Sequence, residues 1–139
     1  MNNVNIGGDI KSFGDILNYH SVNSPDKIFI NEPLTGNKFT YREFNILVNK
    51  TASLLLENNL AKGDFCSIII ENSWRYLCFY FAAIKLGVVI NPFPITLEIQ
   101  DLKRYISYVK PGLVAVTSRI SEQLIKLDST LNVLEVSEF

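Results

Sequence analysis

Three runs of apolar residues contain almost no polar side chain, and they indicate strands that helices cover on both faces. They read FCSIII at 65–70, VVI at 88–90 and LVAV at 113–116. Uninterrupted runs rich in valine and isoleucine are typical of parallel sheets, whereas a strand with one face in water alternates apolar and polar residues. NVLEV at 132–136 is a weaker candidate for a fourth parallel strand.

Helical patterns separate these strands along the chain. One occupies residues 74–86 and ends at Gly87, because glycine favours the left-handed conformation that terminates many helices. Another occupies residues 98–109, where apolar residues recur at the spacing of one helix face, and a weaker one occupies 121–127. Strands that alternate with helices form right-handed βαβ units. The pattern therefore predicts a three-layer α/β fold around a mostly parallel sheet.

Before the first of these strands, the pattern predicts a helix and a β-hairpin. Ser12 can cap a helix that begins at Phe13. Two short apolar runs, at 27–33 and 38–40, flank a turn that contains Gly36, which is typical of a hairpin.

Short motifs also mark where two helices begin. TYRE at 40–43 has the form of a capping box, in which the Thr40 and Glu43 side chains each bond the other residue's backbone N–H. Asn72 is the expected cap of the helix at 74–86. Both motifs are interpreted as structural.

The helix at 74–86 is apolar almost all round, because Arg75 and Lys85 are its only charged residues. Such a helix belongs inside a large structure. We therefore expect a further layer, outside this chain, to cover the helix. Self-association through the helix is the alternative. Residues 1–11 show no pattern and are expected to be loose.

The composition agrees with a largely interior segment. Apolar residues make up 47% of the chain and charged residues 19%, against about 25% in ordinary domains. The formal net charge is −1, and the lysines and arginines are scattered. Nucleic acid is therefore not expected as a partner, since it is bound through clustered cations.

The expected location is the cytoplasm. Cys66 and Cys78 stand in apolar runs without CxxC spacing, which favours buried thiols of a reducing compartment over a disulfide or a metal site. The N-terminus lacks the charged and apolar regions of a signal peptide. No membrane span is expected, because Lys85 would cost roughly 3 kcal/mol at the centre of the most apolar window.

Four stretches follow one another along the chain: FTYREF at 39–44, GDFCSIIIENS at 63–73, IKLGVVINP at 84–92 and NPFPITLEIQDLKRYISYVKPGLVAVT at 91–117. In this order they resemble the N-terminal subdomain of the AMP-binding, adenylate-forming enzymes. These include acyl- and aryl-CoA ligases, luciferases and peptide-synthetase adenylation domains. INPFP is more similar to the CoA-ligase branch, because amino-acid-activating domains carry an acidic residue after the proline and this chain does not.

The resemblance implies a fragment of a two-step ligase, in which residues 12–139 form the incomplete N-terminal α/β subdomain of a larger doubly wound domain. In that family a carboxylate attacks the α-phosphate of ATP, and a thiol such as CoA then displaces AMP from the acyl-adenylate. The family holds ATP and Mg²⁺ with a Ser/Thr/Gly-rich phosphate loop and other segments that follow the region matched here. Triphosphate charge needs such backbone N–H groups and cations. This chain has seven glycines, no three of them in one short loop.

We therefore expect the chain alone to be inactive and to bind no ATP, Mg²⁺ or CoA, which are implied for the full-length enzyme. It is expected to supply no catalytic residue and no metal ligand. Its expected partners are the rest of the parent ligase and, in that parent, a small carboxylic acid.

One loop is the candidate for a functional role. Phe93, Pro94 and Ile95 follow the carboxyl end of a predicted parallel strand, the usual ligand-facing edge of an α/β sheet. Arg119 follows the next strand at the same edge and could meet a phosphate. In some members of the family, the corresponding loop lies near the CoA nucleotide. The alternatives are packing for the loop residues and a solvated surface position for Arg119.

Two other interpretations are open. A stand-alone, non-catalytic binding or assembly module could have the same subdomain fold. A small flavodoxin-like or response-regulator domain would also contain βαβ units. The chain lacks the acidic phosphoacceptor cluster and the Ser/Thr-rich phosphate loop that such a domain needs.

Overall fold

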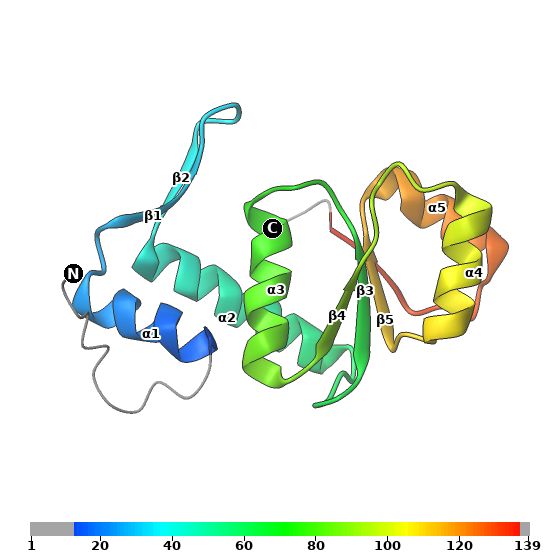
Figure 1. Cartoon of the computed structure of the whole chain (residues 1–139), viewed down its shortest axis with the longest axis horizontal. Helices are drawn as coiled ribbons and strands as arrows, with labels where there is room; N and C mark the ends of the chain where they lie inside the picture. Colours follow the sequence, from blue (N-terminus) through cyan, green and yellow to red (C-terminus); the bar gives the residue numbers. More distant parts are fainter. Residues whose placement is uncertain (1–12, 137–139) are drawn as a thin grey trace, which may run out of the picture.

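The computed structural model describes residues 13–136, which form helices around two separate sheets (Figure 1). In chain order, the elements are α1 (Phe13–Asn23), β1 (Ile28–Glu32), β2 (Asn37–Thr40), α2 (Tyr41–Glu57), β3 (Phe65–Ile69), α3 (Trp74–Leu86), β4 (Val89–Pro92), α4 (Ile99–Val109), β5 (Leu113–Val116), α5 (Ser118–Leu127) and β6 (Val133–Glu135). The predicted order of helices, hairpin and strands is confirmed.

The main sheet has four parallel strands in the order β4-β3-β5-β6. Strand β3 lies in the middle, where Ser67 is opposite Asn91 of β4 on one side and Val114 of β5 on the other. The weak NVLEV pattern does form the fourth strand. The other sheet is the antiparallel β1-β2 hairpin.

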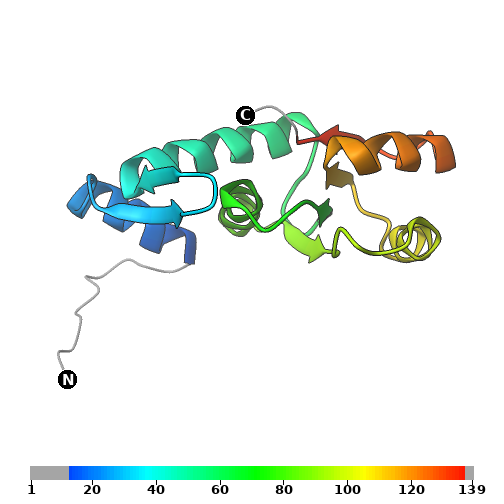
Figure 2. The ribbon, with the colours of Figure 1, turned by 90° about the horizontal axis from the view of Figure 1, so that it is seen from above.

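The main sheet is the middle one of three layers. Helices α2 and α3 lie on one face and α4 and α5 on the other, as Figures 1 and 2 show from two directions. Successive side chains of β3 and β5 point to opposite faces, and both faces are covered, which explains why these strands are apolar apart from Ser67. Cys66 and Ile68 face the cluster beneath α2 and α3, whereas Ile69 faces the cluster beneath α4 and α5. Each layer of helices therefore has its own apolar core.

Helix α1 and the hairpin pack on α2 and α3, at the end of the molecule away from the sheet (Figure 1). Aromatic rings fill the contact: Phe29 stacks on Tyr41 with ring centroids 4.6 Å apart, and Phe81 packs edge-on to Phe44 at 5.8 Å. The chain thus covers most of α3 itself. Of the large apolar side chains of this helix, Leu77 and Ile84 stay substantially exposed.

The capping box before α2 and the glycine after α3 lie at the helix ends where they were predicted. The capping box is present, with Glu43 N–H donating to Thr40 Oγ1 at 3.2 Å and Thr40 N–H donating to the Glu43 carboxylate at 2.8 Å. Gly87 ends α3 in the left-handed region at φ 71°. Ser12 lies outside the described residues.

Two boundaries differ from the predictions. Ser73, not Asn72, caps α3, because its backbone is extended and its hydroxyl accepts from Tyr76 N–H at 3.5 Å. Helix α5 begins at Ser118 instead of residue 121. Its first turn is held by Thr117, whose carbonyl accepts from Ile120 N–H at 3.0 Å and from Ser121 N–H at 3.1 Å.

Among residues 13–136, strand β4 forms one edge of the main sheet, and a proline lies on its unpaired side. Val89 N–H donates to Asp64 O at 2.8 Å and Phe93 N–H donates to Ile68 O at 2.9 Å, so alternate residues of β4 turn their nitrogens toward β3. The nitrogens of Ile90 and Pro92 therefore turn outward. Proline has no N–H to donate.

None of the helices within residues 13–136 is both long enough and apolar enough to cross a bilayer.

Candidate functional site

The carboxyl ends of β3, β4 and β5 meet at one edge of the sheet, because all three strands run in the same direction. Three connections leave from this edge: residues 70–73 lead into α3, residues 93–98 lead into α4, and Thr117 leads into α5. This edge is where ligands bind in open α/β sheets. It therefore defines the candidate site.

Phe93 anchors the loop after β4. Its N–H donates to Ile68 O at 2.9 Å, and its ring stacks on Tyr105 of α4 at 5.7 Å between centroids. The half-buried ring also packs against the core beneath α4 and α5. Pro94 and Ile95 are exposed, with Ile95 at 43%. Phe93 thus has a packing role that holds the loop in place, whereas the side chains of Pro94 and Ile95 are exposed to solvent.

Two hollows meet at this loop. The first, of about 390 Å³, lies beside α3 and has these lining residues: Ile70, Asn72, Tyr76, Pro92, Phe93, Pro94, Ile95 and Thr96. The second, of about 270 Å³, lies between the loop and α5 and includes Arg119 in its lining. Ile95 and Thr96 line both. The structure therefore brings all four residues predicted for the site to one edge.

Arg119 supplies a positive charge at this edge. Its side chain is exposed at the start of α5, across the second hollow from Ile95. Within the described part of the chain, its guanidinium makes no hydrogen bond or ion pair. Five N–H donors in a planar fork suit a phosphate or a carboxylate. Arg119 can accordingly meet an anion that enters the second hollow.

A third hollow, of about 450 Å³, lies between the hairpin and the first turns of α3. Asn72 and Tyr76 line both this hollow and the first, so the two are neighbours. The Tyr76 hydroxyl lies 3.4 Å from that of Tyr80. Desolvation, and then the hydrogen bond and charge of Tyr80, raise the pKa of Tyr76 to about 12. Tyr76 is therefore a neutral hydroxyl near pH 7.

Glu32 ties the hairpin to α3 and lines the third hollow. Its carboxylate accepts a hydrogen bond from Trp74 N–H, the first N–H of α3, and from Thr35 Oγ1 at 2.9 Å and Asn37 Nδ2 at 3.2 Å. Desolvation acts to raise the pKa of Glu32, but the hydrogen bonds from Asn37, Thr35 and Trp74 outweigh it and hold the pKa below 4.5. The native fold thus favours the carboxylate.

We expect Glu32→Gln to lower the free energy of unfolding by about 0.5–1 kcal/mol at pH 7, because the helix loses an anionic cap. A lowered pKa means that the carboxylate stabilises the fold above pH 4.5, and that this stability is lost as the pH falls through the native value. The difference from the wild type should therefore shrink below pH 4.5. Urea unfolding at pH 7 and pH 4 measures it.

Glu57→Gln is the matched control, because Glu57 is exposed in the last turn of α2, away from the hairpin. It should change stability equally at the two pH values. A Glu32→Gln difference that is the same at pH 7 and pH 4 would contradict the capping role.

The sequence did not indicate Glu32 or Tyr76 as parts of this edge, and Asn72 was interpreted as a helix cap, with a ligand contact as the alternative. Across residues 13–136, no three His, Cys, Asp or Glu side chains come together in a group that could hold a metal ion.

Comparison with known sequences gives consistent matches. The family model described as AMP-binding enzyme matches residues 18–138. The chain is 34% identical over 83 residues to a long-chain-fatty-acid–CoA ligase, FadD13, of Mycobacterium tuberculosis, and covers 16% of that protein. It is 26% identical over 107 residues to 4-coumarate–CoA ligase 3 of Arabidopsis thaliana, and covers 18% of it. The chain thus spans less than a fifth of these two relatives.

Solved structures give the same result. The N-terminal domain of FACL13 from Mycobacterium tuberculosis superposes with a TM-score of 0.83 at 25% identity, over 91% of this chain and 34% of that one. The NpsA N-terminal subdomain of Klebsiella oxytoca, in complex with 3-hydroxybenzoyl-AMSN, has a TM-score of 0.75 at 25% identity. That match covers 91% of this chain and 30% of that one.

Proposed function

We propose, because this chain belongs to the AMP-binding enzyme family, that it is the N-terminal part of an ATP-dependent acyl- or aryl-CoA ligase. The observation that carries the proposal is the family match over residues 18–138. In the parent enzyme, a small carboxylic acid would be adenylated with release of pyrophosphate, and CoA would then displace AMP to form the thioester. The chain supplies the first α/β subdomain of that enzyme.

In this proposal, the carboxyl edge of the sheet faces the CoA side of the parent site. Arg119 would meet a phosphate, since it is exposed and makes no other polar contact among residues 13–136. Pro94 and Ile95 would offer apolar contact, while the Phe93 ring holds the loop against α4 through its stack on Tyr105.

The residues of this edge do not fit the triphosphate and Mg²⁺. The connections that lead into α3, α4 and α5 contain no glycine, lysine or arginine, and Arg119 follows them in the first turn of α5. Adenylation needs several N–H donors and cations around the phosphates. We therefore assign ATP and Mg²⁺ binding to other segments of the parent, and expect the chain alone to be inactive.

The remainder of the parent is the proposed partner of this chain. Leu77 and Ile84 lie two turns apart on α3 and are 36% and 39% exposed, so they offer an apolar surface to a further layer. We also place the protein in the cytoplasm, because Cys66 and Cys78 are free and buried. Light scattering tests the alternative, a self-associating module: a monodisperse dimer that Leu77→Ser and Ile84→Ser dissociate would favour the module.

The first test is to read the coding DNA beyond codon 139. A frame that continues into a Ser/Thr/Gly-rich loop ending in lysine supports the proposal, and a stop codon contradicts it. In the protein so encoded, Arg119→Ala should raise the KM for CoA about tenfold, since a charge-assisted contact is worth about 1.5 kcal/mol. Arg104→Ala is the control, because Arg104 pairs with Asp101 on an exposed part of α4.

Separate assays of adenylation and of thioester formation distinguish the proposed ligase role of the parent from the proposed CoA contact of Arg119. ATP–pyrophosphate exchange should be unchanged by Arg119→Ala if Arg119 acts on CoA alone. Loss of exchange in this variant would contradict the CoA role while leaving the ligase role intact. Exchange by the isolated 139-residue chain would contradict its proposed inactivity.

A further inference from the structure

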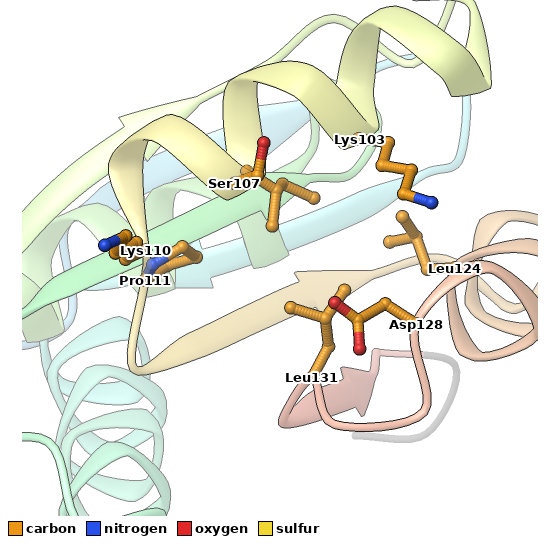
Figure 3. A pocket seen from close by; sticks show the side chains of 8 residues that line it. Lys103, Ser107, Lys110, Pro111, Leu124, Asp128 and Leu131 are labelled. Atoms are coloured by element: carbon orange, nitrogen blue, oxygen red, sulfur yellow. The ribbon is translucent and has the colours of Figure 1, made fainter.

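A hollow of about 250 Å³ lies between α4 and the segment that follows α5 (Figure 3). Lys110 and Pro111 in its lining precede β5, and Leu131 precedes β6. The hollow is therefore at the amino ends of the strands, opposite the edge that carries Arg119. It is separate from the site proposed above.

The base of this hollow is apolar. Ile106 of α4 and Leu124 of α5 are 3% and 1% exposed, and Pro111 and Leu131 are half-buried beside them. Pockets for drug-sized ligands begin at about 300 Å³. The space therefore suits a smaller body of a few carbon atoms, and burial of such a body stabilises a complex by about 0.8 kcal/mol for each CH₂ group.

Polar side chains of α4 and of the residue that ends it line the rim. Lys103 and Ser107 are four residues apart on one face of the helix, and Lys110 follows the last helical residue with a left-handed backbone. Figure 3 shows Lys103 toward one end of the hollow and Lys110 toward the other. Among residues 13–136, Lys110 makes no ion pair. An ammonium on a flexible four-carbon stem can turn toward an anion bound between these ends.

Asp128 is the anion of this lining, and hydrogen bonds from Thr130 stabilise its carboxylate. Its Oδ1 accepts from Thr130 Oγ1 at 2.6 Å and from Thr130 N–H at 3.0 Å. These two hydrogen bonds hold the pKa of Asp128 below its ordinary value, with a smaller contribution from the charge of Lys103. Lys103 and Lys110 carry two positive charges and Asp128 carries one negative charge, so the lining has a net positive charge.

We propose that this hollow binds a short amphipathic monoanion, namely an aliphatic or aromatic carboxylate of about four to six carbon atoms. Its apolar body would lie on Ile106 and Leu124, and its carboxylate would lie between the ammonium groups of Lys103 and Lys110. Binding at this place needs neither ATP nor any other part of a ligase. It can therefore be tested on the 139-residue chain whether or not the proposed function holds.

Sodium hexanoate is the probe, titrated into the ¹⁵N-labelled chain at low salt and followed by amide chemical shifts. Saturable shifts should gather at residues 103–112 and 124–131. Hexan-1-ol has the same apolar body without charge and should bind about fivefold more weakly, and hexylammonium should bind more weakly still. Salt at 0.5 M should weaken hexanoate binding and leave that of hexan-1-ol unchanged.

Four variants define the site. Lys110→Asn should weaken hexanoate about fivefold, and asparagine tolerates the left-handed backbone at this position, where φ is 50°. Asp128→Asn keeps the acceptor for Thr130 but removes the negative charge, so it should tighten binding. Ser107→Leu should fill the hollow and abolish binding with both lysines present. Lys50→Gln, on exposed α2 across the sheet, is the charge-matched control and should change nothing.

Three results would each overturn the proposal. One is the absence of saturable shifts in residues 103–112 with hexanoate. Another is hexylammonium binding as tightly as hexanoate. A third is equal weakening by Lys110→Asn and Lys50→Gln, which would indicate an effect of net charge alone. Amide spectra of each variant without ligand show whether the fold is intact.

Discussion

Replacing Phe79 with alanine is expected to lower the free energy of unfolding by about 3–5 kcal/mol. Phe79 is in the middle of α3, its side chain is 0% exposed, and it belongs to the core shared by α1, α2, α3 and one face of the sheet. Truncation would leave a cavity between layers that cannot collapse without moving α3. Domains of this size have total stabilities of about 5–15 kcal/mol. The variant should therefore be partly unfolded or close to it.

Urea unfolding followed by circular dichroism measures this loss, and Tyr108→Ala is the matched control. Tyr108 also loses an aromatic ring, but it is 88% exposed on α4. Its substitution should change stability by less than about 0.5 kcal/mol. A cost for Phe79→Ala below 1 kcal/mol would mean that the core beneath α3 is not packed as described.

The two cysteine thiols should react with a disulfide reagent at pH 8 at least about a hundredfold more slowly in the native chain than in urea. Burial raises the pKa of Cys66 and of Cys78 to about 12 in each case, and for Cys78 it outweighs the lowering effect of a hydrogen bond with Thr51. The thiolate is the reactive form, and an unfolded thiol with a pKa of about 8.5 is partly ionised at pH 8. Both burial and the low thiolate fraction therefore protect the sulfurs.

Single-cysteine variants show which thiol reacts. Cys66→Ala leaves Cys78 beneath α2, and Cys78→Ala leaves Cys66 on β3, so each protection factor can be measured alone. The rate should rise with urea in step with unfolding. A thiol that reacts within seconds in native buffer would contradict its placement in the core.

Much of the fold could be predicted because its signals are local or repeat along the chain. The apolar runs on β3 and β5, the capping box at Thr40 and Gly87 at the end of α3 each depend on a few neighbouring residues. The resemblance read from four short stretches is likewise confirmed by the family match. Parallel strands also predict that residues after β4 and β5 share one edge, as Ile95 and Arg119 do.

What could not be predicted depends on contacts between distant residues or on the exact backbone path. Glu32 bonds Trp74 N–H across 42 positions, and no periodicity signals such a contact. Asn72 and Ser73 are equally good capping residue types, so the choice between them rests on which one has the extended backbone before α3. Tyr76 lies at the candidate edge because it is in the first turn of α3. The apolar pattern of that helix indicated only a packing role for it.

Pro92 has a consequence for the protein at high concentration. Val88, Val89 and Ile90 favour the strand conformation, and a further strand can pair with an open edge only where it finds a regular row of N–H donors. On the open side of β4, Ile90 presents such a donor and Pro92 interrupts the row. Prolines on edge strands guard against sheet-to-sheet aggregation. The residue that ends the strand before the candidate loop thus also leaves an approaching strand one donor short at this edge.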